Sequence, residues 1–194
     1  MKKILFLLLI LVGAGSSGAA ANEWKLDLSH SNVLFDVRHI YSSVGGRFPD
    51  FTGKVFFDPA QPEKSSCEFV VKVDSIDTAN GKRDNHLRAD DFFAAKSHPK
   101  MTFKSKTVKP LSGNTYLLTG DMTIRDVTKE VEMEFTYLGQ KEHPFKKGQI
   151  VAGFETRLTI DRLDYNVGNG KFYKMGVVGK EVNIFVSLEM TRKK

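Results

Sequence analysis

Cysteine is almost absent from this sequence, because Cys67 is the only one among 194 residues. No disulfide bond within the chain can therefore hold the fold together, and the hydrophobic core must do so alone. Tryptophan is also scarce, with one residue against 15 phenylalanines. Outside the N-terminus, no apolar stretch approaches the ~20 residues that a membrane-spanning helix requires. Together these features favour one domain with a phenylalanine-rich interior and no spanning helix.

The N-terminus has the layout of a secretory signal peptide. Lys2 and Lys3 precede nine apolar residues at 4–12, and Ala19 to Ala21 offer an A-x-A cleavage site before Asn22. The apolar run is too short to span a bilayer, so cleavage near Ala21 is expected. This predicts a periplasmic or secreted protein made of residues 22–194, with an uncleaved N-terminal anchor as the alternative.

Positive charge is in slight excess, with a formal net charge of +6. Lysine and glutamate alternate along the polar faces of the chain, which is typical of solvated surfaces. The basic tail Arg192-Lys193-Lys194 favours a transient contact with an anionic membrane surface. Export makes nucleic acid a poor partner.

Apolar and polar residues alternate with a period of two over most of residues 31–189. Each such run predicts a strand with one apolar and one polar face. The dipeptide Arg125-Asp126 is expected to be a tight turn between two of them. The predicted strands are eight in number and cover residues 31–41, 47–58, 67–74, 101–106, 116–124, 127–137, 152–160 and 182–189.

Eight long strands with one shared apolar face predict an all-β, antiparallel barrel, because closure removes the exposed edges. An eight-stranded barrel is wide enough for its own side chains or for one small ligand. Residues 77–95 break the alternation and predict one or two short helices that cover the barrel, with Asp77 or Thr78 as the cap. Residues 165–179 contain four glycines and predict a long, mobile connection.

Several blocks of the sequence resemble the YceI-like family, in order and over nearly all of residues 22–194. One departure is Asp126, where the family often has glycine. The blocks are WKLDLSHSNVLFDVRHI (24–40), GRFPDFTGKVFFDP (46–59), SIDTANGKRDNHLRADDFF (75–93), HPKMTFKS (98–105), GDMTIRDVTKEVEMEF (120–135), DRLDYNVG (161–168) and GKEVNIFVSLE (179–189).

The resemblance implies an extended, lipocalin-like barrel with a long internal channel. It also implies that the channel holds a polyisoprenoid or another long-chain amphiphile, such as an isoprenoid quinone, a polyprenyl phosphate or a fatty amide. The family is typically periplasmic or secreted, forms dimers commonly and is not known for enzymes. No metal or cofactor other than such a lipid is expected.

The inward face of the predicted strands supplies the candidate channel lining. Aromatic rings and flexible methionines would tolerate a methyl-branched chain of variable length. A solid barrel filled by the same side chains is the alternative. The candidate lining residues are Phe35, Val37, Phe51, Phe69, Val71, Met101, Phe103, Met122, Met133, Phe135, Phe154, Leu158 and Ile184.

Four polar residues are candidates for the lipid head group: His39, Arg83, His86 and Arg162. Each also has a structural interpretation. His39 could be a hydrogen-bonded structural histidine, Arg83 and His86 could make local salt bridges on a helix, and Arg162 could pair with a carboxylate to close the barrel. Asp164, Asp84 and Asp91 are its candidate partners.

Two alternative functions follow from the same residues. Asp84, His86 and Arg83 could serve a lipid-modifying enzyme, since a carboxylate can orient a histidine base, although no nucleophile accompanies them. A solid barrel would suit a stress or interaction protein. His30, His98 and His143 show no metal-ligand spacing, and Cys67 is expected to be an inert residue on the inner face.

Overall fold

The computed structural model describes residues 23–194, so the predicted signal peptide lies outside the described residues. Strands dominate this part of the chain. They are β1 (Glu23–Leu26), β2 (Asn32–His39), β3 (Ser42–Arg47), β4 (Phe51–Phe56), β5 (Ser66–Lys72), β6 (Lys100–Pro110), β7 (Thr115–Ile124), β8 (Val127–Glu142), β9 (Gln149–Asp161) and β10 (Val178–Lys193). The helices are α1 (Gly81–Arg88) and α2 (Lys171–Lys174), with short 3-10 turns η2 (Pro62–Lys64), η3 (Val73–Ser75) and η4 (Arg162–Tyr165).

The sheet closes on itself as an antiparallel barrel. Its order runs β1-β4-β5-β6-β7-β8-β9-β10, and β1 pairs in turn with β10, so eight strands complete the ring. The predicted eight-stranded antiparallel barrel is therefore confirmed. The turn between β7 and β8 is also confirmed at Arg125-Asp126, with Arg125 in the left-handed region at φ 54°.

Two strands, β1 and β3, were missed by the sequence pattern. β1 has only four residues, too few for an alternation to stand out. β3 reads SSVGGR and offers one large apolar residue. The other eight strands correspond to the eight predicted ones, and the second predicted run begins later than expected, since β4 starts at Phe51.

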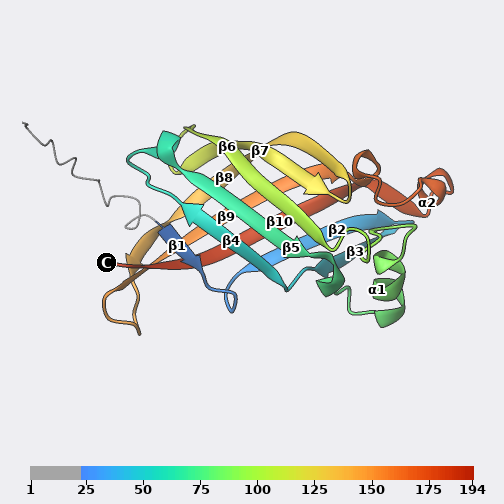
Figure 1. Cartoon of the computed structure of the whole chain (residues 1–194), viewed down its shortest axis with the longest axis horizontal. Helices are drawn as coiled ribbons and strands as arrows, with labels where there is room; N and C mark the ends of the chain where they lie inside the picture. Colours follow the sequence, from blue (N-terminus) through green and yellow to red (C-terminus); the bar gives the residue numbers. More distant parts are fainter. Residues whose placement is uncertain (1–22) are drawn as a thin grey trace, which may run out of the picture.

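The barrel has two unlike ends, as Figure 1 shows. At one end β1 and the C-terminus lie together, and β10 pairs with β1 at Met190 and Thr191. Toward the other end β10 pairs with β2, which carries β3 as an extra strand. β3 meets the following segment at a bridge between Arg47 and Asp77. Residues 73–99, which include α1, connect β5 to β6 at this end of the barrel (Figure 1).

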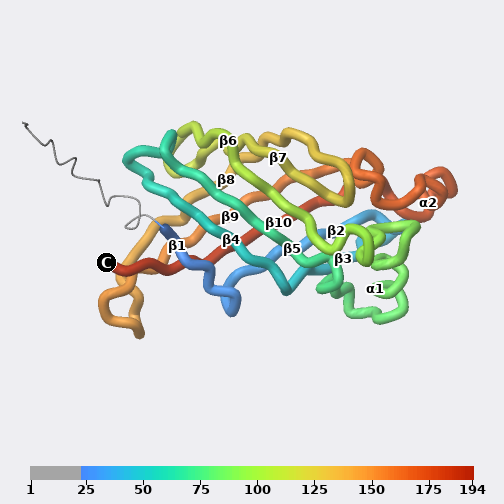
Figure 2. The backbone as a smooth tube through the Cα atoms, in the orientation of Figure 1, coloured from blue at the N-terminus to red at the C-terminus, as the bar shows by residue number. Residues whose placement is uncertain are grey.

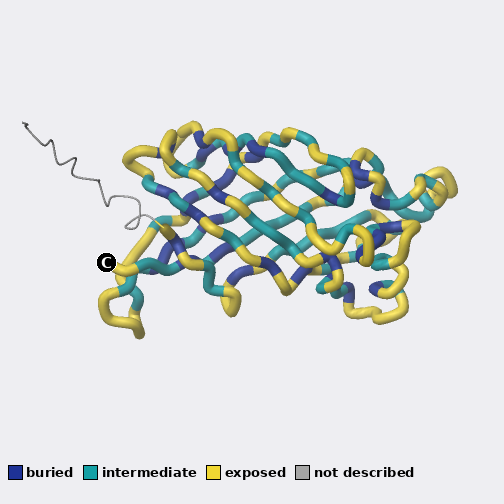
Figure 3. Tube along the Cα trace, viewed as in Figure 1, coloured by how far each residue is buried: buried dark blue, intermediate teal, exposed yellow. Residues whose placement is uncertain are grey.

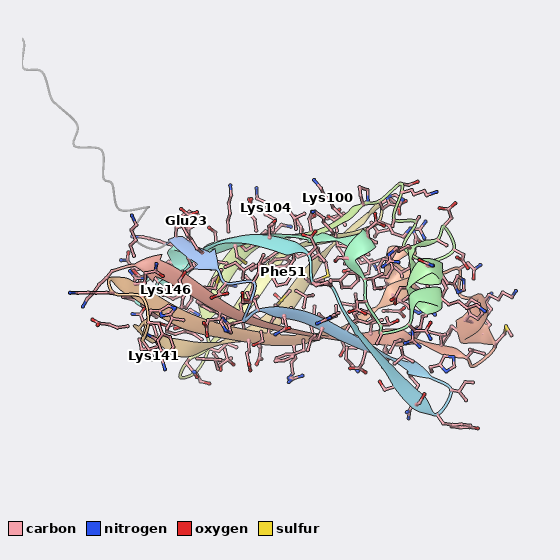
Figure 4. The ribbon with its side chains drawn as sticks, turned by 90° about the horizontal axis from the view of Figure 1, so that it is seen from below. Glu23, Phe51, Lys100, Lys104, Lys141 and Lys146 are labelled. Atoms are coloured by element: carbon pink, nitrogen blue, oxygen red, sulfur yellow. The ribbon has the colours of Figure 1, made fainter. Side chains whose placement is uncertain are left out.

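Side chains alternate between the interior and solvent along the strands, as the period-two pattern requires (Figure 3). In Figure 4, Phe51 lies between the walls, whereas Lys100 and Lys104 point away from the barrel. Among the described residues, no helix is long and apolar enough to cross a membrane.

Both ends of the described chain lie at the same end of the barrel (Figure 2). Aromatic rings pack this terminal end. The Phe57 ring lies 5.1–5.6 Å from the rings of Tyr116, Phe135, Tyr137 and Phe154. The Trp24 indole Nε1 donates a hydrogen bond of 3.1 Å to the Phe57 carbonyl. This cluster packs the terminal end solidly and closes it.

The helix predicted within residues 77–95 exists as α1, but its cap was predicted wrongly. Asn80 is the N-cap, and its side chain accepts a hydrogen bond from the Arg83 backbone N–H. Asp77 instead pairs with Arg47, and the Thr78 hydroxyl donates to Asp84. The connection at residues 165–179 contains part of η4 and all of α2.

Candidate functional site: an apolar cavity in the barrel

The barrel encloses a cavity of about 280 Å³. A water molecule requires about 10–15 Å³ on the same measure, so the cavity has room for a chain of roughly 20 heavy atoms. The described interior is therefore not solid, and the alternative of a barrel filled by its own side chains is wrong. All thirteen candidate lining residues line this cavity: Phe35, Val37, Phe51, Phe69, Val71, Met101, Phe103, Met122, Met133, Phe135, Phe154, Leu158 and Ile184.

The packing of these residues differs along the barrel. Met133, Phe135 and Phe154, on the side of the packed end, are buried, and so is Phe51, which pairs with Val71 toward the α1 end. Phe35, Phe69, Met101 and Ile184 have intermediate exposure although they point inward. The cavity therefore runs from the α1 segment to the aromatic cluster, where Phe57, Phe135 and Phe154 line its other end.

Three phenylalanines lie flat against the wall because glycines face them. Phe35 pairs with Gly46 and Phe69 pairs with Gly53 across neighbouring strands. A Cβ added to Gly46 would lie 2.5 Å from Phe35 Cζ, and one added to Gly53 would lie 2.5 Å from Phe69 Cδ1. Real Cβ atoms essentially never approach that closely, so each ring occupies the space of the missing side chain.

Gly120 is related to Phe103 in the same way, with 2.5 Å between an added Cβ and Phe103 Cζ. The three phenylalanines thus line the bore without crossing it. Sequence reasoning did not identify these glycines as part of the site. The available signal was a glycine at an inward position of a strand, which marks a close approach of another group.

The lining is almost entirely apolar. Among the described residues, Glu155 and Arg162 are the charged ones that border the cavity. Glu155 accepts a hydrogen bond from the Ser187 hydroxyl, on the outward side of β9 and β10. An apolar chain inside would therefore leave no charged group unpaired along the bore, whereas a polar ligand would lose its hydration there.

Cys67 is buried in the cavity wall, as predicted. Burial raises the pKa of its thiol from 9.0 to about 12, because desolvation disfavours the thiolate. The thiol is protonated at neutral pH and behaves as a small apolar group.

The open end of the cavity is bordered by the segment around α1. Leu87, Phe92 and Phe93 line the cavity there. Arg125 Nη1 donates to the Phe92 carbonyl at 2.6 Å and also to the Asn166 carbonyl. The turn residue Arg125 therefore ties two loops of the mouth together, a role that the sequence pattern did not reveal.

Arg162 performs a similar task on the other side of the mouth. It is buried and borders the cavity, and its guanidinium donates to the carbonyls of Gly179 at 2.8 Å, Val167 at 2.6 Å and Val178 at 3.4 Å. Burial lowers its pKa below the usual arginine value.

The prediction that Arg162 pairs with a carboxylate is wrong, because the Arg162 guanidinium donates its hydrogen bonds to backbone carbonyls. The three candidates pair elsewhere. Asp164 pairs with Lys129 at 2.7 Å, Asp91 bonds His86 at 2.8 Å, and the Asp84 carboxylate accepts from the Thr78 N–H at 2.9 Å.

The other three head-group candidates do not border the cavity in the described structure. His39 ends β2 and pairs with Ser42 and Val178. Arg83 donates to the Thr78 hydroxyl at 2.8 Å and to the Thr78 carbonyl at 2.7 Å. Its side chain thus fixes the start of α1, and only Arg162 of the four lies at the bore.

The proposed catalytic group of Asp84, His86 and Arg83 is not assembled either. His86 bonds Asp91 and stacks edge-on to Phe92, with ring centroids 5.0 Å apart. Asp84 is buried against Thr78 and does not orient the imidazole. The three side chains therefore stabilise α1 and its surroundings.

Among the described residues, one group of potential metal ligands is found, on the outside of the barrel. Asp27, His30 and Glu189 place their ligand atoms within 4.8 Å of one another. His30 Nδ1 lies 3.3 Å from Asp27 and 3.6 Å from Glu189, which describes a surface ion-pair cluster. Partial burial acts to raise the pKa of Asp27, but hydrogen bonds from His30 and the Ser29 N–H hold it below its usual value.

The barrel and its motifs match a known family of domains. The model of the YceI-like domain matches residues 24–190. This chain belongs to the YceI-like family. It is 34% identical over 188 residues to Protein YceI of Escherichia coli O157:H7, covering 95% of this chain and 94% of that one. It is also 33% identical over 186 residues to a UPF0312 protein of Pectobacterium carotovorum, covering 95% and 93%.

Solved structures share the fold of this YceI-like chain. BcnA of Burkholderia cenocepacia superimposes with a TM-score of 0.76 at 29% identity, over 84% of this chain and 98% of BcnA. The Campylobacter jejuni YCEI protein gives 0.70 at 30% identity, over 79% and 87%. A polyisoprenoid binding domain from Saccharophagus degradans gives 0.61 at 14% identity, over 88% and 98%, a likeness of fold alone.

Proposed function

We propose that this protein is a non-catalytic carrier or store for a long-chain amphiphilic lipid of the polyisoprenoid class. The observation that supports it is the apolar cavity of about 280 Å³, closed at one end and bordered by the α1 segment at the other. A linear, apolar ligand matches this shape, with its tail against the aromatic cluster and its polar head near the mouth.

The energetics of such a ligand are favourable without polar contacts. Burial of each CH₂ group contributes ~0.8 kcal/mol, so a tail of roughly 20 carbons contributes about 16 kcal/mol before the cost of immobilising it. Affinity then depends on chain length and shape. Head-group preference would come from the mouth, where Arg162 borders the cavity.

One protein of the same fold is named for this class of ligand. A domain of the same fold from Saccharophagus degradans is described as polyisoprenoid binding. That likeness concerns the fold, so the ligand class for this chain rests on its own cavity.

The first test is the lipid content of the purified protein. Organic extracts analysed by mass spectrometry should contain a stoichiometric long-chain lipid. After the bound lipid has been removed, added polyprenol or isoprenoid quinone at about 100 times its Kd should stabilise the protein by about 2.7 kcal/mol, which raises Tm by roughly 5–10 °C. Extracts without lipid, together with an unchanged Tm, would refute the proposal.

A blocked bore provides the second test. Ile184 lies between Leu158 and Phe35 on the inner wall, so Ile184→Trp should project an indole into the bore, obstruct it and strongly reduce lipid binding. Phe185→Trp is the matched control, because Phe185 lies on the outer face beneath the Arg157 guanidinium, 3.8 Å from its ring centroid. Retention of lipid by Ile184→Trp would exclude the barrel as the binding site.

The absence of catalysis is proposed on the same geometry. His86→Ala should leave lipid content unchanged, and the lipid recovered from the protein should be chemically identical to the lipid supplied. A product whose formation stops in His86→Ala would instead favour the enzyme.

We also propose that the protein is exported and functions in the periplasm or outside the cell. The N-terminal pattern of residues 1–21 supports this. The intact mass of the protein isolated from fractionated cells should correspond to a chain that begins at Asn22, and a cytoplasmic, uncleaved chain would contradict it.

A further inference from the structure

Two segments meet at the open end of the barrel and form a rim, defined here as residues 38–44 and 170–178. The Ile40 N–H donates to the Val177 carbonyl at 3.0 Å, and His39 pairs with Val178. Figure 1 places β2 and α2 at the same end of the molecule, opposite the C-terminus. The rim is thus one continuous edge built from the β2–β3 turn and from α2.

The rim exposes large apolar side chains that the core does not use. Tyr41 is 94% exposed, Met175 62%, Ile40 51% and Tyr173 44%. Ile40 also has a left-handed backbone at φ 51°, which is rare for a β-branched residue. A turn optimised for stability alone would have glycine or asparagine at that position. The strained, exposed isoleucine therefore indicates that this turn contacts another surface.

The charges of the rim have one sign. Arg38, Lys171 and Lys174 accompany the exposed apolar side chains, and neither segment contains an acidic residue. Tyrosine and lysine beside apolar side chains are typical of surfaces that lie at a membrane interface. A negatively charged bilayer satisfies both the apolar and the cationic groups.

The rim is directly connected to the cavity. Phe172, next to Tyr173, stacks on Phe92 with ring centroids 6.0 Å apart, and Phe92 lines the cavity. Val178, at the end of the rim, also lines it. A bilayer in contact with the rim would lie against the mouth, so an apolar ligand could cross without passing through water.

We propose that the rim docks the open end of the barrel onto an anionic lipid bilayer, where the ligand is loaded or released. This rests on the proposed lipid-carrier function. It assigns the membrane contact to the rim and not to the basic tail, which lies at the packed end. There Trp24 and its neighbouring rings close the barrel.

The packed end offers a matched control with the same chemistry. The turn between β8 and β9 carries Phe145, 90% exposed, beside Lys146 and Lys147. Figure 4 shows Lys146 near Glu23 at the end opposite α2. A non-specific attraction of lysine and phenylalanine to vesicles would act through this turn as strongly as through the rim.

The test is flotation of the full-length mature protein with vesicles of phosphatidylcholine, alone or mixed with phosphatidylglycerol. Each surface lysine contributes roughly fivefold to binding of an anionic bilayer, so Lys171→Gln with Lys174→Gln should weaken binding roughly thirtyfold. Tyr41→Ser with Met175→Ser should also weaken it. Lys146→Gln with Lys147→Gln should leave binding unchanged, and higher salt should weaken binding of the parent protein.

The proposal is overturned if the Lys146 and Lys147 double variant loses binding as strongly as the rim variants, or if no variant changes it. Lipid content by mass spectrometry and circular dichroism are measured on the same samples. Rim variants should keep the fold and the bound lipid while transferring lipid to vesicles more slowly. A parent protein that binds vesicles through the rim but contains no lipid would refute the carrier function and leave the docking surface intact.

Discussion

The pairing of Phe69 with Gly53 predicts that Gly53→Ala lowers stability when the Phe69 ring is present and raises it when the ring is absent. An added Cβ at Gly53 would lie 2.5 Å from Phe69 Cδ1, so Gly53→Ala must push the ring off the wall. Overpacking of this kind costs about 1–3 kcal/mol of unfolding free energy. The displaced ring enters the cavity, so the variant should also bind less lipid.

The double-mutant cycle with Phe69→Ala separates this clash from other effects. Gly53 has no positive φ that would strain a side chain, and its three nearest contacts are all atoms of the Phe69 ring. Without the ring, Gly53→Ala should stabilise the strand by about 0.5–1 kcal/mol, because alanine loses less conformational entropy on folding. The substitution should therefore change sign between the two backgrounds.

Urea unfolding of the four proteins measures the cycle, with equal m-values as the condition for comparing them. Gly53→Ala that costs the same in both backgrounds would refute the idea that the glycine exists to receive the ring. Gly120 is a poorer choice for this test, because its added Cβ would also lie 2.5 Å from the Lys104 carbonyl oxygen.

Three further predictions concern the mouth, the wall and the packed end. Arg162→Met should lower the unfolding free energy by about 3 kcal/mol, because it leaves buried carbonyls at the mouth unpaired. Amide hydrogen exchange at α2 should accelerate, and unchanged exchange would contradict the role of Arg162 in holding the mouth together. Above pH 9 the thiol of Cys67 ionises in the unfolded chain but not in the folded one, where its pKa is about 12, so the parent protein should lose about 1.4 kcal/mol of unfolding free energy per pH unit. Cys67→Ala should abolish this loss, and parallel pH profiles of the two proteins would refute the prediction. Trp24→Phe should lower the unfolding free energy by about 1–3 kcal/mol, because it removes the hydrogen bond to the Phe57 carbonyl. Lipid content should not change, because Trp24 lies beyond the cavity lining, and a loss of lipid would show that the packed end takes part in binding.

Much of the barrel could be predicted from local sequence. The alternation of Val33, Phe35 and Val37 with polar neighbours defines a strand with one wet face, and eight such strands favour closure. The same alternation placed every candidate lining residue on the inner wall. The short strand β1 and the glycine-containing β3 were missed because they have too little alternation to register.

The polar residues were harder to interpret, since their partners are distant in the sequence. Arg162 was expected to need a carboxylate, but loop carbonyls at Val167 and Gly179 satisfy it. His86 and Asp84 are two residues apart on α1, yet His86 bonds Asp91 and Asp84 bonds Thr78. Sequence spacing places side chains on a helix face, but it does not specify which loop packs against that face.

The sequence by itself determined the antiparallel barrel, its apolar inner face and its membership in the YceI-like family, because strand periodicity and motif order are local properties. Only the tertiary structure decided that the barrel holds a cavity and that an aromatic cluster closes it at the terminal end. The cause is register: Gly46, Gly53 and Gly120 face phenylalanine rings across strands and draw them to the wall, while the rings around Phe57 meet at the centre. Both sets are aromatic residues on an inner face, and only strand pairing distinguishes them.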